Sequence, residues 1–158
     1  METIVIYTDG GCKPNPGAGG WGAVIVRGGS EQSLSGGESA TTNNRMEMTA
    51  ALRALESLPA GQSVVLYTDS SYLKNGITSW MPAWRRRGWK TTGGTDVLNR
   101  DLWESLDVAM SQHRVQWKWV RGHAGNAGNT KADRLATEAR ERYGSARRPS
   151  AESRAFGR

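Results

Sequence analysis

Four acidic residues, distant from one another in the sequence, stand where a folded chain could gather them. Asp9 ends one β-type run and Asp69 ends another, in the matching contexts IYTDG and LYTDS. Glu47 and Asp133 each lie about one turn inside a segment whose apolar residues recur at helical spacing. If the two runs are parallel neighbours, Asp9 and Asp69 emerge at the same sheet edge, where open α/β sheets bind ligands.

Such a group of carboxylates suits one kind of chemistry. Crowded carboxylates repel and raise each other's pKa, and a divalent cation removes that cost. Mg²⁺ and Mn²⁺ prefer carboxylate and water oxygens, and two such ions about 4 Å apart support phosphodiester cleavage. The alternative is that the acids only cap helices or offset helix dipoles. The shared Tyr-Thr context of Asp9 and Asp69 favours the metal site.

The elements that would position these acids follow in the order βββαβααβα. The expected strands are residues 3–8, 21–27, 30–38, 63–68 and 114–120. The expected helices run from 41–44 to Leu58, from Ser70 to Asn75, from Asn99 to Gln112 and from Asn129 to Arg142, with Gly76 and Gly144 closing two of them. An antiparallel start followed by αβ alternation implies an α/β fold, a mixed sheet flanked by helices.

Length and composition limit the class of protein. The 158 residues suit one domain, and the basic tail, residues 144–158, is expected to be disordered. No run of 18 apolar residues spans a membrane, and the first residues read as a strand instead of a signal peptide. The single cysteine, Cys12, excludes an internal disulfide and fits a reducing cytoplasm. One cysteine and two histidines cannot complete a zinc site.

Basic and aromatic residues are concentrated in one segment. The net charge is +6, which is compatible with a polyanionic partner. Within residues 80–90, arginine can pair with phosphate and tryptophan can pack on sugars or bases. The alternative is a helix with its tryptophans in the core and its arginines in water, and Trp80 is expected to be partly in the core. The residues concerned are Trp80, Trp84, Arg85, Arg86, Arg87, Trp89 and Lys90.

Six motifs in order identify a family resemblance. They are YTDGGCxxNPGxGGWG (7–22), TTNNRMEM (41–48), YTDSSY (67–72), WRRRGWKT (84–91), WVRGHAG (119–125) and KADRLA (131–136). Together they resemble a bacterial type 1 ribonuclease H over residues 2–143. The resemblance implies a ribonuclease H-like fold in a catalytic domain of residues 1–143, with a five-stranded mixed sheet in the order 3-2-1-4-5.

The resemblance also implies an activity and its residues. The activity is endonucleolytic hydrolysis of the RNA strand of RNA–DNA hybrids, leaving 5′-phosphate and 3′-hydroxyl ends. A monomer in the cytoplasm without an obligate protein partner is the default expectation. Two Mg²⁺ ions, with Mn²⁺ as a possible substitute, would be held by the matching acids Asp9, Glu47, Asp69 and Asp133. His123 matches a histidine that relays protons or assists product release. Taken without the family, a lone histidine is more often structural or solvated.

Substrate recognition would depend on the 2′-hydroxyl, which both donates and accepts hydrogen bonds. The resemblance places Asn15, Asn43, Asn44 and Asn99 along the minor groove and Thr42 at a DNA phosphate. Capping of the helix is the alternative for the Asn43–Asn44 pair, and both roles can coexist.

Two positions depart from the family pattern, and the basic segment has a family counterpart. Ser71 stands where many relatives carry glutamine or another longer side chain, so one minor-groove contact is in doubt, and Thr130 stands where some carry glutamate. The tryptophans and arginines of residues 80–90 match a basic protrusion that grips the DNA strand.

The sequence disfavours three other interpretations. Gly17, Gly19 and Gly22 fit G-x-G-x-x-G, but a strand follows them where a dinucleotide site needs a helix. A non-cleaving module that binds hybrids or double-stranded RNA would be expected to lack at least one of the four acids. A domain of a reverse transcriptase is disfavoured by a start directly at the first strand and a complete basic protrusion.

Overall fold

The computed structural model describes residues 2–120 and 126–147, built around a mixed sheet in the order β3-β2-β1-β4-β5. The central strand β1 pairs antiparallel with β2 and parallel with β4, and β5 adds parallel to β4. The predicted mixed sheet and its strand order are confirmed. The strands are β1 Thr3–Cys12, β2 Gly17–Arg27, β3 Ser30–Thr41, β4 Ser63–Thr68 and β5 Arg114–Trp119.

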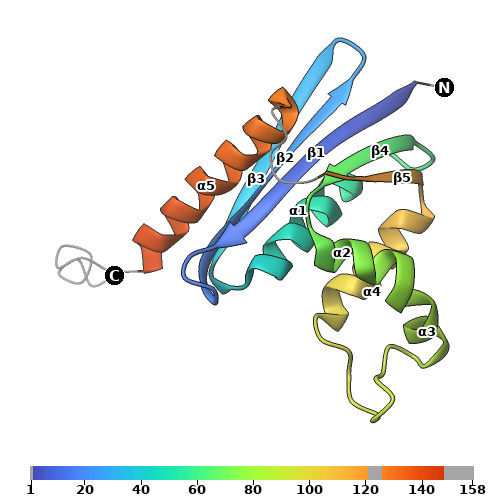
Figure 1. The fold of residues 1–158 in the computed structure, drawn as a ribbon. Coiled ribbons are helices and arrows are strands. Elements are labelled where there is room, and N and C mark those ends of the chain that lie inside the picture. The colour runs from blue at the N-terminus through green and yellow to red at the C-terminus, as the bar shows by residue number, and fades with distance from the viewer. Residues whose placement is uncertain (1, 121–125, 148–158) are drawn as a thin grey trace.

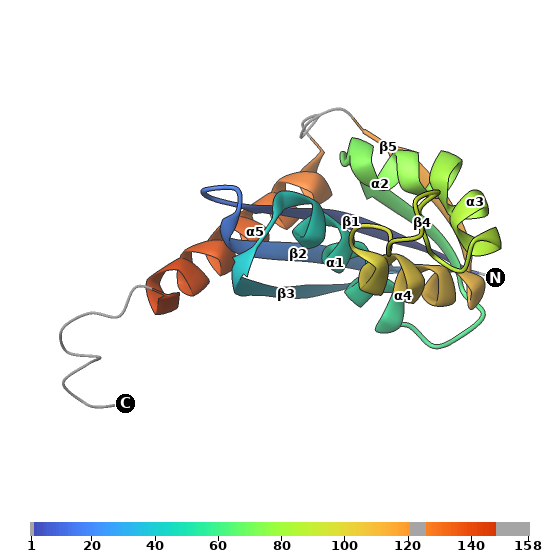
Figure 2. The same cartoon turned by 90° about the horizontal axis from the view of Figure 1, so that it is seen from below.

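Helices cover both faces of this sheet. Figure 1 shows α5 across β1, β2 and β3 on one face, with α1 behind the same strands on the other. Figure 2 shows α4 beside α1, farther from the sheet. No described helix combines the length and apolar character needed to cross a bilayer. The helices are α1 Asn43–Glu56, α2 Ser71–Asn75, the π-helical turn η1 Gly76–Trp80, α3 Met81–Arg86, α4 Arg100–Ser111 and α5 Ala127–Arg147.

The main core lies between the sheet and the layer of α1 and α4. Alternate residues of a strand face opposite sides of the sheet, and the buried positions of β1 and β4 follow that period. Complete burial of each large side chain stabilises the fold by roughly 1.5–3 kcal/mol. The largest fully buried members of this core include Ile4, Ile6, Met48, Leu55, Val64, Leu66, Leu73, Trp103 and Leu106.

The first two strands are longer than predicted. Residues 9–12 of β1 pair with residues 19–22 of β2, although residues 10–20, rich in glycine, proline and asparagine, were expected to form a loop. At Gly20 and Gly22 an added Cβ would lie under 3.0 Å from the backbone of α5. Glycine is there because the helix packs directly on the strand, and not because the chain turns.

The short helix predicted to end before Gly76 is confirmed, with Gly76 as the C-cap residue of α2. The chain stays helical beyond it, however, and continues through η1 into α3. A Cβ on Gly76 would lie under 3.0 Å from the ring of Trp103, which is fully buried in α4. The glycine therefore serves the packing of two helices. At the other end of the chain, α5 continues past Gly144, its predicted end, to Arg147.

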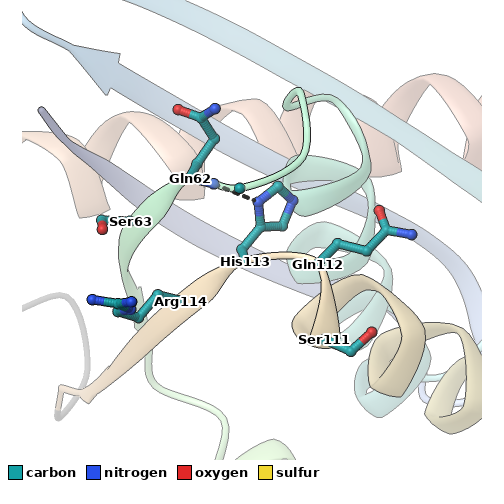
Figure 3. A pocket seen from close by; sticks show the side chains of 7 residues that line it. Gln62, Ser63, Ser111, Gln112, His113 and Arg114 are labelled. Atoms are coloured by element: carbon teal, nitrogen blue, oxygen red, sulfur yellow. Dashed lines mark hydrogen bonds between the residues drawn. The ribbon is translucent and has the colours of Figure 1, made fainter. Parts of the chain in front are cut away.

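His113 lies next to the start of β4 and β5, at the end of the sheet opposite to the predicted acids. Figure 3 shows His113 in a polar cavity of about 330 Å³ between the start of β4 and the end of α4. Its Nδ1 accepts from the backbone N–H of Gln62 (3.3 Å), which requires the imidazole proton to be on Nε2. Nε2 then donates to the carbonyl oxygen of Leu55 at 3.3 Å. The imidazole thus ties the end of α1 to the sheet.

Substitution of Gly76 by alanine is expected to destabilise the fold by about 1–3 kcal/mol, the usual cost of overpacking a core. The free energy of unfolding in urea measures this. Gly29→Ala is the matched control, because a Cβ at Gly29 meets no atom within 4 Å. Equal stability of the two variants would contradict the packing role assigned to Gly76.

Candidate active site

Three of the predicted acids converge at one edge of the sheet. Asp9, Glu47 and Asp69 each offer a carboxylate oxygen, and these atoms all lie within 4.8 Å of one another. All three residues are half-buried. The described part of the chain contains no second group of this kind built from histidine, cysteine or acids. The cluster is therefore the candidate site for catalysis.

The sheet and one glycine bring the three acids together. The parallel register of β1 and β4 reaches Tyr7 opposite Tyr67, so the two chains leave this edge together, with Asp9 and Asp69 two residues further on. Glu47 comes from the first turns of α1. A Cβ at Gly10 would lie 2.5–2.7 Å from the backbone of Met46 and Glu47, so only glycine lets this helix approach β1 so closely.

Burial and mutual repulsion make negative charge on the three carboxylates unfavourable. Burial, and after it the charges of Asp69 and Asp9, together raise the pKa of Glu47 to about 8, against a hydrogen bond from Ser70 that lowers it. Without a cation the site therefore retains a proton on Glu47 at neutral pH. An oxygen-rich, anionic group of this kind fits a hard divalent cation, which would release that proton.

Two further predicted catalytic residues are not part of this group. Asp133 lies in the second turn of α5, half-buried, and has no oxygen within the 4.8 Å set. His123 falls outside the described residues. The structure thus brings together three of the four predicted carboxylates.

Hydrogen bonds link Asn15 to Asn43 and Asn43 to the end of β1. Asn43 Oδ1 accepts from the backbone N–H of Cys12 at 2.7 Å, and Asn15 Oδ1 accepts from the backbone N–H of Asn43 at 3.2 Å. A backbone N–H is always a donor, so both amide oxygens are fixed toward the protein. Next to them, Thr42 caps α1 through a hydrogen bond from the N–H of Arg45, and Asn44 is half-buried in the first turn.

Asn99 is the N-cap residue of α4, where the predicted helix begins, and its backbone has a φ of 61°. Its side chain makes no capping bond. Instead its Oδ1 accepts from Arg45 Nη1 (3.1 Å) and its Nδ2 donates to the hydroxyl of Tyr72 (3.0 Å). Arg45 is also paired with both oxygens of Asp101. Sequence reasoning missed Arg45 and Asp101, although the arginine stands inside the TTNNRMEM motif.

The aromatic residues of the basic segment pack on one another. Trp80, Trp84 and Trp89 are half-buried, with ring centroids 5.6 and 6.4 Å apart along the series, and they rest against the core. The ring of Trp84 also lies 5.5 Å from that of Trp103. The expectation that Trp80 is partly in the core is confirmed.

The three arginines of this segment differ in their surroundings. Arg85 donates through Nε and Nη2 to Asp107 Oδ1 on α4, at 2.9 and 2.6 Å. Arg86 and Arg87 are exposed, as is Ser71 at the start of α2. Arg85 therefore ties α3 to α4, whereas its two neighbours face solvent.

Comparison with known proteins agrees with this geometry. A family model described as RNase H matches residues 1–141. A Ribonuclease H of Thiobacillus denitrificans is 56% identical over 137 residues, covering 87% of this chain and 93% of that protein. A Ribonuclease HI of Pseudomonas aeruginosa is 54% identical over 135 residues, covering 85% and 91%.

A solved structure gives the same result in three dimensions. The crystal structure of LC9-RNase H1, described as a type 1 RNase H with the type 2 active-site motif, matches with a TM-score of 0.79 and 31% identity. The match covers 98% of this chain and 84% of that one. Sequence, strand order and the carboxylate cluster therefore lead to one conclusion: this chain belongs to the ribonuclease H family and is an enzyme of its bacterial type 1 class.

Proposed function

We propose that this chain is an endonuclease that hydrolyses the RNA strand of RNA–DNA hybrids and leaves 5′-phosphate and 3′-hydroxyl ends. The observation that carries the proposal is the convergence of Asp9, Glu47 and Asp69 oxygens within 4.8 Å. Family membership supplies the substrate class. We further propose that residues 1–143 form the catalytic domain and act as a monomer in the cytoplasm, without an obligate protein partner.

The proposed reaction depends on two divalent cations, Mg²⁺ or Mn²⁺. Asp9, Glu47 and Asp69 would hold them, and Asp133 would complete the set from α5. Bound ions of this kind activate a water and stabilise the leaving oxygen of a phosphodiester. The protein contributes anionic oxygens in a fixed arrangement, and Ser70 donates a hydrogen bond that favours the ionised form of Glu47. His123 would assist proton transfer or product release.

Recognition of RNA would use fixed amide donors. Because Asn15 and Asn43 direct their oxygens to backbone N–H groups, their Nδ2 groups are the ends left for a substrate. An NH₂ group can donate to a 2′-hydroxyl oxygen or to the minor-groove acceptors of bases. Asn44, Asn99 and Ser71 would extend this contact, and Thr42 would hold a phosphate of the DNA strand.

The DNA strand would lie against the basic segment. Arg86 and Arg87 are exposed and carry the charge that phosphates require, while the half-buried Trp80, Trp84 and Trp89 give the segment a rigid base. Arg85 contributes positive potential, although its guanidinium is already paired with Asp107.

Asp9→Asn is expected to bind a labelled hybrid but to cleave it at least about a hundredfold more slowly, because cation stabilisation of the transition state is worth several kcal/mol. Cleavage is followed with hybrid, RNA duplex, DNA duplex and single strands, each with Mg²⁺ or EDTA. The wild-type chain should cut only the hybrid, and EDTA should stop it. Full activity of the variant would remove Asp9 from the site, and hybrid binding without cutting by the wild type would favour a binding module.

Removal of metal is expected to make stability depend on pH through Glu47. The folded metal-free chain holds a proton on Glu47 up to about pH 8, whereas the unfolded chain releases it near 4.5. The stability that this proton provides is complete below pH 4.5 and is lost as pH rises toward 8, with a slope of up to about 1.4 kcal/mol per pH unit.

Urea unfolding of wild type and Glu47→Gln in EDTA, at several pH values, isolates this contribution. The variant should lack the downward slope, and saturating Mg²⁺ should stabilise the wild type by about 2.7 kcal/mol at a hundred times its Kd. Parallel curves for the two proteins would show that Glu47 does not carry the proton.

Arg86→Ala and Arg87→Ala are each expected to weaken hybrid binding and to reduce the log–log salt slope by about 0.9, the value for one lost phosphate contact in duplex DNA. Arg85→Ala is the matched comparison and should change the slope less, since Asp107 already neutralises that guanidinium. Fluorescence anisotropy at several salt concentrations, with Ca²⁺ in place of Mg²⁺, measures both quantities. Equal slopes for the three variants would contradict the distinction between them.

A further inference from the structure

The repeated Tyr-Thr-Asp motif contains two tyrosines whose role the metal site does not explain. Tyr7 and Tyr67 are register partners in the parallel pair β1–β4. Their rings are stacked, with centroids 5.1 Å apart and an interplanar angle of 14°. Each tyrosine stands two residues before an acid of the cluster, Asp9 or Asp69. The stacked pair therefore lies directly behind the carboxylate edge.

The first turn of α5 rests on this pair. A Cβ built on Gly128 would lie under 3.0 Å from three ring atoms of Tyr7, Cγ, Cδ2 and Cε2. The Tyr7 ring is held by its stacking on the ring of Tyr67. A side chain at position 128 is therefore expected to displace the first turn of α5 from this ring.

A second close contact lies one turn further along α5. Gly22 is the register partner of Asp9, and a Cβ on Gly22 would lie 2.6 Å from both the carbonyl oxygen of Ala132 and Cβ of Leu135. These residues flank Asp133 in the helix. The strand β2, which pairs with β1 beside Asp9, thus contacts the helix turn that carries Asp133.

The start of α5 is also fixed along its own axis. Asn126 Oδ1 accepts from the N–H of Gly128 at 2.7 Å and from that of Asn129 at 3.3 Å, as a helix-capping side chain does. Asn129 is itself buried, with 5% of its surface exposed. Gly128 therefore meets Tyr7 at a defined point of the helix, and Asp133 follows five residues later.

We propose that Tyr7, supported by Tyr67, is a positioning residue: its ring is the seat for Gly128 and sets how closely Asp133 approaches Asp9 and Asp69. The inference rests on the proposed function in one respect, the role of Asp133 as a cation ligand. Asp133 stands outside the set of oxygens that lie within 4.8 Å of one another, so its approach to a bound ion depends on where α5 lies. Misplacement by about 1 Å can cost a hundredfold in rate.

The test uses Gly128→Ala in the full chain, with Mn²⁺ as a paramagnetic probe. Broadening of an amide signal in NMR spectra falls steeply with its distance from Mn²⁺. Relative to wild type, the variant should show weaker broadening at the amide of Asp133 and unchanged broadening at Gly10, beside Asp9. With hybrid and Mg²⁺, kcat should fall about tenfold or more while KM stays within about twofold.

Gly144→Ala is the matched control. It makes the same substitution in the same helix, but the Cβ would meet only Ala18 at 3.7 Å, an ordinary contact. This control should leave both the broadening pattern and kcat as in the wild type. A similar loss in the control would overturn the inference, because the effect would then come from the helix and not from the seat.

Variants at Tyr7 supply the second arm. Tyr7→Phe keeps the ring and should behave as wild type, whereas Tyr7→Leu removes the seat and should weaken the broadening at Asp133. In the Tyr7→Leu background, Gly128→Ala should have a smaller further effect, because leucine lacks Cε2 and the planar ring that the new Cβ would meet. If Gly128→Ala does not fold, the comparison of Tyr7→Phe with Tyr7→Leu decides the matter.

The possible failures are distinguishable. Unchanged broadening and kcat in folded Gly128→Ala or Tyr7→Leu would overturn the seat and leave the proposed nuclease function standing. Absence of broadening at Asp133 in the wild type would overturn the inference, because Asp133 would not be near the ion. Weakened broadening in the variants of a chain that cuts no hybrid would uphold the seat and reject the proposed function.

Discussion

Like charges repel, so holding oxygens of Asp9, Glu47 and Asp69 within 4.8 Å of one another costs free energy that the rest of the fold must offset. The sheet does so by a parallel pairing of β1 and β4 that fixes two of the acids at one edge. Burial of Glu47 makes the arrangement still less favourable for charge. The same conditions that destabilise the empty cluster give a divalent cation its affinity, since the cation relieves repulsion and satisfies the oxygens together.

Close backbone contact is the means by which separate elements reach this edge. Gly10 lets α1 lie close to β1, Gly22 lets α5 lie close to β2, and Gly128 lets α5 lie close to Tyr7. At each of these glycines a Cβ would lie under 3.0 Å from a neighbouring atom. Elsewhere the arrangement depends on hydrogen bonds, as where Arg45 joins α1 to the residue that precedes α4. Glycine at these contacts lacks side-chain packing of its own, so large buried residues such as Trp103 supply the compensating apolar contact.

The convergence of Asp9 and Asp69 could be predicted from the sequence, because the same Tyr-Thr-Asp context at the ends of two buried strands suggests a shared edge. The strand order was predicted from the resemblance to the ribonuclease H family. The sequence did not allow the extension of β2 through its glycines to be predicted, because local propensity assigns such residues to loops and only the neighbouring helix explains them. The helical continuation beyond Gly76 was not predicted, because the packing of this glycine on Trp103 exists only in the folded chain. The hydrogen bonds of Asn99 were not predicted either, because a left-handed backbone and a distant arginine determine where its amide points.

The two outermost strands also bear on how the molecule behaves among copies of itself. An open sheet leaves a row of backbone groups along each edge that could pair with another chain, a common origin of aggregation. Residues 30–33 of β3 are all exposed and include Glu31, and β5 alternates exposed Arg114, Gln116 and Lys118 with half-buried residues. Pairing of two β5 edges would bring Arg114 and Lys118 of one molecule close to the same cations of another and strip them of water. The composition of β5 therefore disfavours association of two copies through this edge of the open sheet.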